Sequence, residues 1–338
     1  MNGNFQVKRL VFMALDPIHI GTGGYRLGRV DAAIAREPGS KLPKIPGTSL
    51  HGAARHYAAY RYNKLRCAGQ GGVGEGHCGL DSCPICYTFG FAKGADAQGF
   101  AGVVNISDAR ILFFPVNSMH GPVWISTEDI LDEAGVTIKG SWPKDAEAWT
   151  TMEKEAPGGK MDTINFGWLM LGYRSGLVID PGKLGQNGEF KTIKDRLVLV
   201  KKEFFSRIVN SNLEVRTSVS INPQTGAAEE GALFTYEAIP RSVFLWMDVI
   251  VDDYRNGKLW QDGGIRWRCH VEETEDGSKR VYLDNDERAG KLSSKGAWES
   301  AGDVVDAGVE WCEYLGIGGM GTRGFGRLRK LADWEVLI

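Results

Sequence analysis

Four of the six cysteines in this 338-residue chain lie in the segment CAGQGGVGEGHCGLDSCPIC, at Cys67, Cys78, Cys83 and Cys86. The last two are separated by two residues, a spacing that lets both thiolates turn toward one ion. Four thiolates complete the tetrahedral coordination of Zn²⁺ and leave no open position, which indicates a structural site. In a cytosolic protein such a cluster indicates a bound metal rather than disulfides.

The ligand set leaves alternatives open. His77 could replace one sulfur, with Cys67 the first to be replaced because it is furthest from the others in sequence. Redox-active thiols and unligated cysteines are two further interpretations. A structural zinc contributes on the order of 10–16 kcal/mol of apparent folding free energy, enough to order a glycine-rich segment as a zinc knuckle over residues 65–92. Cys269 and Cys312 are expected to be core residues.

A second chemical feature is the segment GIGGMGTRGFGRLRK, residues 316–330, which holds six glycines and three arginines. Glycine frees the backbone and lets another chain approach it closely. The segment matches neither the phosphate-binding G-x-x-x-x-G-K-[ST] motif nor a dinucleotide fingerprint, because it follows a helical pattern and not a strand. Main-chain N–H groups beside arginines suit an extended polyphosphate, which predicts contact with a nucleic-acid backbone.

The charge distribution supports one anion-binding face. Forty Lys and Arg against 42 Asp and Glu give a net charge of −2, which argues against a strongly basic nucleic-acid binder. However, residues 36–66 hold seven basic residues and one acid, and residues 316–330 hold four basic residues and no acid. A solvated surface with chance clustering is the alternative. No apolar run is long enough for a signal peptide or a membrane span, so a cytoplasmic protein without membrane contact is expected.

The elements that must position these groups alternate between strands and helices. Strand patterns cover residues 5–21, 102–116, 242–251 and 327–338, and helical patterns cover residues 45–65 and 301–315. Thr48 or Ser49 is the expected N-cap of the first helix. Without a steady βαβ repeat, the order predicts an α+β fold with an antiparallel sheet. Residues 132–190 and 252–297 are weakly patterned and are expected to be peripheral insertions.

Residues 210–240 stand apart because their apolar face is thin. Val215, Thr217, Val219 and Ile221 alternate with polar residues, and the turn signal NPQTG precedes a second strand-like run. A hairpin of this kind is poorly suited to a core. It is predicted to project toward a partner, with an ordinary edge hairpin as the alternative.

With these features in place, the chain resembles the RAMP proteins of CRISPR systems. The glycine segment resembles the C-terminal glycine loop of that superfamily, and LDPIHIGTGG and VDAAIAREPGSKLPKIPGTSLHGAARH resemble its N-terminal strand and the approach to its first helix. CPICYTFGFA, VNISDARILFFPVNSMHGPVWIST and EGALFTYEAIP are similar to the backbone-forming fourth subunit of type III-B Cmr effector complexes. The similarity runs from residue 15 to residue 327 in the order of the family.

The resemblance implies a single RAMP domain over residues 1–338, with a modified RRM-like, ferredoxin-type sheet. It implies copies of the chain stacked in a filament along a crRNA guide, beside other Cmr subunits. The hairpin would be the thumb that kinks the duplex of guide and complementary target RNA. The target RNA would then be cut at regular intervals with Mg²⁺ or Mn²⁺.

The resemblance places the catalytic aspartate of the family at Asp31, in RVDAAIARE. A kinked strand can align the 2′-OH behind its phosphorus, and a carboxylate nearby can accept the proton or hold a metal-bound water. Glu237 and Tyr236 are candidates for a second role. A turn-forming aspartate is the alternative for Asp31, and His19 is interpreted as a structural histidine.

Guide RNA is expected at the N-terminus of the first helix, in the glycine loop and on the hairpin. Lysine is frequent in the family where this chain has His51, so that contact is expected to be weaker or pH-dependent. The predicted RNA-binding residues are Lys44, Gly47, Thr48, Ser49, His51, Arg55, Arg216, Gly318, Gly319, Met320, Gly321 and Arg323.

Four other functions remain open on the sequence. The chain could be a non-catalytic backbone subunit, or the backbone subunit of a type III-A Csm complex. It could also be a processing endoribonuclease of the same superfamily that cuts the CRISPR transcript without metal. A zinc-knuckle RNA-binding protein unrelated to CRISPR is the fourth.

Overall fold

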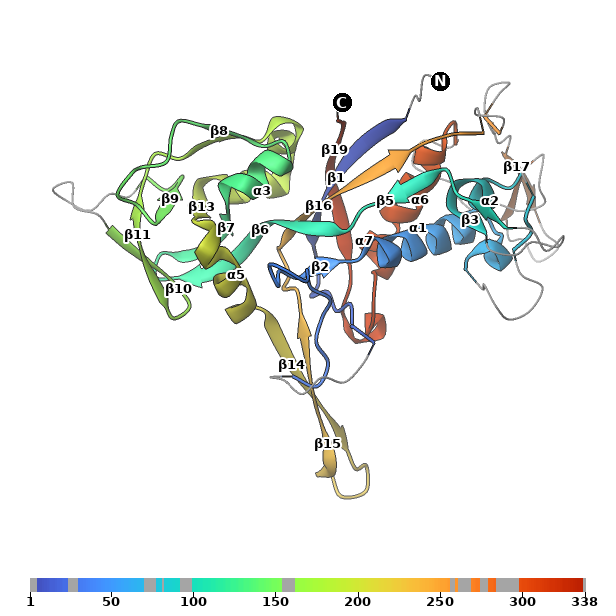
Figure 1. Ribbon diagram of the computed structural model, residues 1–338. Coiled ribbons are helices and arrows are strands. Elements are labelled where there is room, and N and C mark those ends of the chain that lie inside the picture. Colours follow the sequence, from blue (N-terminus) through green and yellow to red (C-terminus); the bar gives the residue numbers. More distant parts are fainter. Residues whose placement is uncertain are drawn as a thin grey trace.

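The computed structural model describes most of the chain. The described residues are 5–23, 30–69, 77–80, 82–91, 99–153, 162–255, 259–260, 269–273, 279–283 and 298–336. The first and last strands lie side by side, so both ends of the chain leave the molecule at the same side (Figure 1).

The centre of the molecule is four antiparallel strands in the order β6-β16-β1-β19. They are β1 (Gln6–Ala14), β6 (Ala109–Ser118), β16 (Phe244–Val251) and β19 (Leu328–Glu335). β1, β16 and β19 lie within the strand patterns predicted from the sequence, and β6 runs two residues past the pattern at 102–116. The short strands β2 (Lys44–Ile45) and β5 (Val104–Ile106) pair with β6 and β16.

Two helices that follow β1 and β16 cover one face of these strands. They are α1 (Gly47–Arg61) and α6 (Ala301–Glu310), and α6 continues through Trp311 into the short helix α7 (Cys312–Leu315). Gly308 explains how closely the two helices pack, because a Cβ atom there would lie 2.0 Å from the carbonyl oxygen of Ala54. Alternate residues of β1, beginning with Leu10 and Phe12, face this helical layer in one core.

The other face of β1 packs against the segment that the sequence left weakly patterned. Val11 and Met13 join a second core with Leu131, Phe190 and Ile193. Residues 132–190 therefore help to cover the second face of the sheet. The elements in and around this part are α3 (Glu128–Glu133), β8 (Thr137–Lys139), β12 (Val178–Asp180), η2 (Gly182–Gln186), α4 (Gly188–Ile193) and η3 (Lys194–Arg196).

The same part of the chain lengthens the sheet beyond β6 in the order β6-β7-β13-β9-β11-β10. The pairs β13–β7 and β11–β9 are parallel, so the expectation of an antiparallel sheet is wrong in this half. The sheet is mixed because crossovers through helices return β13 beside β7 in the same direction. The strands are β7 (Gly121–Ser126), β9 (Ala148–Thr150), β10 (Asp162–Phe166), β11 (Leu169–Arg174) and β13 (Leu197–Val200).

A two-stranded hairpin leaves the sheet after helix α5 (Lys202–Ser211). Its strands are β14 (Glu214–Ile221) and β15 (Ala228–Ala238), and they pair only with each other as a sheet. It projects away from the body as a narrow arm (Figure 1). The hairpin predicted at residues 210–240 is therefore present. Its outer part is exposed, including Val219, Ile221 and Leu233.

The cysteine segment packs against α1, where Arg55 binds the carbonyl oxygens of Cys67 and Gly90. It contains η1 (Leu65–Cys67), α2 (Pro84–Phe89), β3 (Gly90–Phe91) and the partner strand of β3, β4 (Phe100–Ala101). A further hairpin is formed by β17 (Cys269–Glu273) and β18 (Lys279–Leu283). Cys312 is buried as expected, whereas the side chain of Cys269 lies outside the described part.

Candidate nucleic-acid interface and metal site

Backbone hydrogen bonds hold the predicted RNA-binding segments side by side. The N–H of Gly319 donates to the carbonyl of His19 at 3.0 Å, and the N–H of Ala35 donates to the carbonyl of Ile20 at 2.8 Å. The N–H of Lys44 then donates to Ala35 at 3.1 Å. Hydrogen bonds therefore link the glycine loop, residues 18–21, residues 34–36 and the approach to α1 to one another.

Three glycines of the loop are required by the protein itself. A Cβ atom would lie 2.3 Å from the carbonyl oxygen of Ile317 at Gly326, 2.4 Å from Ile20 at Gly318 and 3.0 Å from the backbone at Gly316. All three have positive φ, which only glycine adopts easily. Gly319 and Gly321 have no such clash, so both leave room for a ligand beside the backbone, but the N–H of Gly319 is already bound to the carbonyl of His19.

Most basic residues of the loop are already paired. Arg327 forms an ion pair with Asp16, and Arg329 forms ion pairs with Glu189 and Glu313. Lys330 forms ion pairs with Asp306 and Asp333. Among the described residues, the exposed side chain of Arg323 has no such partner. The free positive charge of this loop is therefore concentrated at Arg323.

Helix α1 begins differently from the prediction. Its first residue is Gly47 after the N-cap Pro46, with no side-chain cap, so the expectation of Thr48 or Ser49 as the N-cap is wrong. Instead the carboxylate of Asp108 accepts a hydrogen bond of 2.7 Å from the N–H of Gly47. Gly47 is needed there because a Cβ atom would lie 2.3 Å from the carbonyl oxygen of Ile106.

Asp108 also binds the side chain of Lys44 at 2.5 Å, and Glu37 lies 3.3 Å from the same ammonium. These hydrogen bonds raise the pKa of Lys44. A phosphate at this helix N-terminus would therefore compete with Asp108 for the N–H of Gly47 and for Lys44. The exposed Thr48 and the half-buried Ser49 remain on the outer side of the turn.

The two remaining candidates on α1 face the cysteine segment. Burial, and then the charge of Arg55, lower the pKa of His51, so this imidazole is neutral at pH 7. Arg55 is only 7% exposed, and its guanidinium binds the carbonyls of Cys67 and Gly90. Because the side chain of Arg55 lies inside the protein, it is not placed to contact RNA as the sequence analysis expected.

Asp31 lies at the root of the hairpin. Its side chain is exposed, and Oδ2 accepts hydrogen bonds of 2.7 Å from both the N–H and the hydroxyl of Thr235. These hydrogen bonds, the backbone one first, lower the pKa of Asp31. Ala32 forms a parallel bridge with Tyr236, which fixes residues 31–32 along the edge of β15. The result is an ionised carboxylate on the surface.

Glu237 and Tyr236 are buried, with 8% and 6% of each residue exposed. The carboxylate of Glu237 forms a 2.5 Å ion pair with Arg36. His19 is also buried, and its Nδ1 lies 2.6 Å from the carbonyl oxygen of Glu237, as a structural histidine would. Glu237 and Tyr236 therefore position the root of the hairpin and do not face solvent as Asp31 does.

A small apolar cluster joins the hairpin to the glycine loop. The rings of Tyr236 and Phe325 meet edge to face with centroids 5.5 Å apart, and Met320 packs against the same group. The guanidinium of Arg216 lies 4.7 Å from the centre of the Phe325 ring and pairs with Glu214 at 2.6 Å. The root of the hairpin therefore packs directly on the glycine loop.

The four cysteines of the predicted metal site come together. The sulfur of Cys67 lies 3.4 Å from Cys78, 3.7 Å from Cys86 and 3.9 Å from Cys83, and Cys78 lies 3.7 Å from Cys86. Zinc–sulfur bonds of about 2.3 Å place sulfurs about 3.8 Å apart in a tetrahedron, so the four thiols fit one Zn²⁺. Cys67 belongs to this group, and Nδ1 of His77 contacts Arg55 instead.

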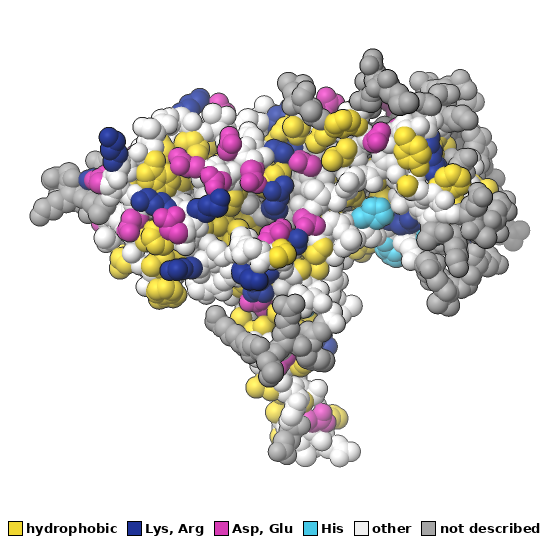
Figure 2. Space-filling model, in the orientation of Figure 1, with side chains coloured by type: hydrophobic (Ala, Val, Ile, Leu, Met, Phe, Trp, Pro, Cys, Tyr) yellow, Lys and Arg dark blue, Asp and Glu magenta, His cyan; other side chains and the backbone are white. Residues whose placement is uncertain are grey.

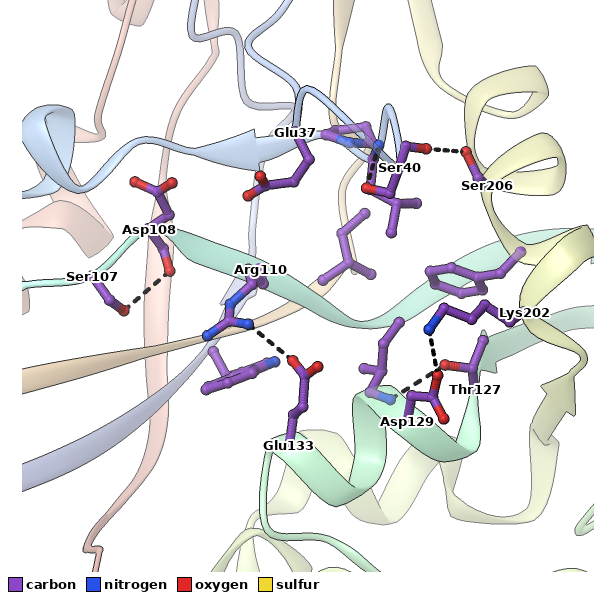
Figure 3. Close-up of a pocket in the computed structure, with 16 residues that line it drawn as sticks. Glu37, Ser40, Ser107, Asp108, Arg110, Thr127, Asp129, Glu133, Lys202 and Ser206 are labelled. Atoms are coloured by element: carbon purple, nitrogen blue, oxygen red, sulfur yellow. Dashed lines mark hydrogen bonds and ion pairs between the residues drawn. The ribbon is translucent and has the colours of Figure 1, made fainter.

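A cavity of about 600 Å³ lies between β6, α3 and α5, and Glu37 and Asp108 also line it. Figure 3 shows Arg110 directed at Glu133 and Lys202 directed at Asp129 across it. Both cations that line the cavity are therefore neutralised, and it offers little to a phosphate chain. A second cavity, of about 720 Å³, is lined by Gly47, Thr48 and His51 at the start of α1.

Four residues of the site were not predicted from the sequence: Thr235, Asp108, Arg36 and Phe325. Thr235 and Asp108 act on Asp31 and Gly47 from positions 204 and 61 residues away, so local spacing carries no signal for them. Phe325 lies inside the glycine segment and was the one residue with a local signal, as the single aromatic side chain among its glycines.

The fold and the site define a RAMP protein, and the chain belongs to the RAMP superfamily, whose family model matches residues 11–329. Over 250 residues it is 27% identical to the CRISPR system Cmr endoribonuclease Cmr4 of Pyrococcus furiosus, covering 70% of this chain and 79% of that protein.

Solved structures show the same fold. A chain of the type III-B Cmr-beta complex bound to cognate target RNA matches with a TM-score of 0.57 and 11% identity, over 96% of both chains. Oligomeric Cmr4 from Pyrococcus furiosus matches with a TM-score of 0.54 and 18% identity, over 98% of this chain and 99% of that one. No helix in the described part of the chain is long and apolar enough to cross a membrane.

Proposed function

We propose that this chain is a backbone subunit of a type III-B CRISPR ribonucleoprotein that binds crRNA and cleaves complementary target RNA. The observation that carries the proposal is the meeting of three elements at one place. An exposed carboxylate, Asp31, sits at the root of a projecting hairpin that packs on the glycine loop through Phe325. The similarity to the Pyrococcus endoribonuclease supports cleavage, and the similarity to an RNA-bound complex supports the partner.

The central unit is a ferredoxin-type, RRM-like βαββαβ arrangement. In chain order, β1, α1, β6, β16, α6 and β19 supply the strands and helices, and the sheet order β6-β16-β1-β19 supports this assignment. The chain is then a single RAMP domain over residues 1–338. The knuckle, residues 132–190, the hairpin and residues 252–297 are insertions into it.

The guide follows the surface from the glycine loop to the start of α1. Backbone N–H groups near Gly321 and the side chain of Arg323, which has no ion-pair partner in the described part of the chain, contact its phosphates. Gly318, Met320 and Arg216 shape this surface from beneath, because Gly318 packs on His19 and Ile20 while the other two pack around Phe325. Lys44, Gly47, Thr48, Ser49 and His51 border the path at α1.

The hairpin acts as the thumb that bends the guide–target duplex. Its outer residues are largely uncharged, and Figure 2 shows it as a narrow projection below a body on which acidic and basic side chains are mixed. Exposed Val219, Ile221 and Leu233 can displace a base pair without binding phosphate. Such a bend brings the 2′-OH of the target strand into line with its phosphorus.

Asp31 is the catalytic residue. Because hydrogen bonds from Thr235 lower its pKa, the carboxylate is a weak proton acceptor but a good ligand for a hard cation. A divalent ion, Mg²⁺ or Mn²⁺, would neutralise charge developing at the phosphate when bound. The second carboxylate oxygen, Oδ1, has no partner among the described residues and would hold that ion, while Thr235 keeps Oδ2 in place.

The tetrathiolate site holds a structural Zn²⁺. Zinc suits four sulfurs in a closed tetrahedron and takes no part in cleavage, because its ligands are inside the knuckle. Copies of this chain and other Cmr subunits complete the assembly. The oligomeric state of the matched Cmr4 structure supports self-association.

The decisive experiment compares assembled complexes that contain the wild-type chain or Asp31→Asn. We expect equal guide content and equal target binding, with cleavage reduced by about 10²–10⁴-fold. Cleavage that is lost on omission of Mg²⁺ and restored by its addition supports the role of the ion. Unchanged cleavage by Asp31→Asn would contradict the enzymatic part and leave a non-catalytic backbone subunit.

A further inference from the structure

Arg55 is a buried cation that lacks an acidic partner. It is 7% exposed, and no carboxylate among the described residues forms an ion pair with it. Its neighbour on the same helix, Arg61, is 8% exposed but pairs with Glu310 at 2.7 Å. Burial of an uncompensated charge is costly, so Arg55 requires negative charge from another source.

The cysteine cluster supplies negative charge beside Arg55. The guanidinium donates a hydrogen bond of 2.7 Å to the carbonyl of Cys67, one of the four residues whose sulfurs meet. Four thiolates around one Zn²⁺ carry a net charge of about −2, and this group lies in the same buried region as the guanidinium. Each buried charge therefore compensates the other in part.

The hydrogen bonds of Arg55 also link the pieces of the knuckle. Nε donates to the carbonyl of Cys67 at 2.7 Å, and Nη1 donates to Gly90, directly after α2, at 2.6 Å. Nη2 lies 3.1 Å from Nδ1 of His77, the residue before Cys78. Because a guanidinium has only donors, His77 must accept with a bare Nδ1, so its ring is neutral there.

We propose that Arg55 is the positioning residue and counter-charge of the tetrathiolate site, an inference that rests on the proposed zinc. One planar fork fixes the three segments that carry Cys67, Cys78 and Cys86 onto α1. Outer-shell partners of this kind orient the ligands and tune metal affinity. The sequence predicted that Arg55 contacts RNA, whereas its surroundings indicate that it supports the zinc ligands.

The experiment measures zinc binding by the full chain. Zinc affinity is measured by chelator competition for the wild type, Arg55→Met, Arg55→Lys and the control Arg61→Met, and the Co²⁺ forms are compared by absorption spectroscopy. Arg55→Met should lower zinc affinity roughly 10–100-fold. Arg55→Lys should fall between it and the wild type, because the charge is kept but the fork is lost. Arg61→Met should melt at a lower temperature yet bind zinc as the wild type does.

Each other outcome is decisive. Wild-type zinc affinity in Arg55→Met, or an equal loss in Arg61→Met, would overturn the role of Arg55 and leave the zinc site standing. If Arg55→Met does not fold, Arg55→Lys decides, and unchanged affinity with an unchanged Co²⁺ spectrum overturns the proposal. A wild-type chain that binds neither Zn²⁺ nor Co²⁺ would remove the metal site itself and this inference with it.

Discussion

Thr235 donates two hydrogen bonds to one carboxylate oxygen of Asp31, from its backbone N–H and from its hydroxyl, each 2.7 Å long. The two residues are 204 positions apart in sequence, yet this contact fastens the loop that carries Asp31 to the root of the hairpin. The carboxylate is therefore held in a fixed orientation while its outer side stays exposed.

Removing the hydroxyl alone should reduce cleavage without affecting assembly. Thr235→Val preserves the shape and the backbone N–H but frees Oδ2 from one of its two donors, so Asp31 loses its fixed orientation. Small misplacements of a reacting group cost up to about 10²-fold in rate, and we expect a loss of about 10-fold to 10²-fold in single-turnover cleavage. Thr163→Val, at an exposed threonine of β10, is the matched control and should cleave normally. Equal rates for Thr235→Val and wild type would show that this contact does not matter.

The lowered pKa of Asp31 predicts that the cleavage rate falls with acidification only at an unusually low pH. A carboxyl group whose pKa is lowered below the ordinary 3.8 is still mostly ionised at pH 3.8. A cleavage step that needs the ionised carboxylate should therefore slow only at a pH below 3.8. Single-turnover rates measured from about pH 3 to about pH 8 should therefore show no inflection at the ordinary aspartate pKa of about 3.9. An inflection near the ordinary histidine pKa of about 6.5 would instead point to an imidazole and contradict the assignment.

The glycine loop makes two separable predictions, because its glycines serve different purposes. Gly326→Ala places a methyl group 2.3 Å from the carbonyl oxygen of Ile317 at positive φ, and should destabilise the chain by about 1–3 kcal/mol. Gly319→Ala meets nothing closer than 3.6 Å and should leave the melting temperature unchanged while weakening guide RNA binding. Thermal melting and RNA binding of both variants check this. The distinction is lost if the two variants melt alike.

The sequence predicted those parts of the fold whose signal is local. Runs such as the one at Gln6–Ala14 are apolar because both faces of the strand are buried, and the apolar stripe of residues 301–315 marks a helix packed on one side. The thin apolar face of the hairpin likewise indicated a projecting arm. The four cysteines lie close in sequence, so their spacing indicated their site.

Other parts depended on contacts that no local pattern records. The strands β9, β10 and β11 within residues 132–190 are short, and they join the mixed sheet through the pairing of β9 with β13. The start of α1 is set by Asp108, which lies between β5 and β6 and is 61 positions away, and this contact replaces the N-cap expected from Thr48 or Ser49. Arg55 has the residue type of a phosphate ligand, but only the packed structure shows that it is buried.

Zinc content should depend on the cluster and not on cysteine in general. We expect about one zinc per wild-type chain, lost in Cys83→Ser because a hydroxyl is a poor zinc ligand and the tetrahedron is left incomplete. Cys312→Ser is the matched control: Cys312 is also buried, at 3% exposure, but lies outside the cluster, so that variant should keep its zinc. Elemental analysis of the three proteins measures this. A metal-free wild type that melts normally would argue against a structural zinc.

The Arg36–Glu237 pair allows the role of Glu237 to be tested apart from its contribution to stability. The two side chains are 23% and 10% exposed, so Arg36→Met leaves a largely buried carboxylate unpaired. Loss of one partner of a fully buried pair costs about 3–5 kcal/mol, and partial exposure of Arg36 should reduce this to about 1–3 kcal/mol. The double variant Arg36→Met/Glu237→Leu removes both charges, so its free energy of unfolding should recover most of the loss.

Cleavage by the same two variants then separates the alternatives. If Glu237 only fixes the root of the hairpin, target cleavage should fall in Arg36→Met and recover with stability in the double variant. That is the expected result, because Glu237 is buried and faces Arg36, whereas Asp31 faces solvent. A double variant that is stable and binds guide RNA but does not cleave would instead place the carboxylate of Glu237 in the reaction itself.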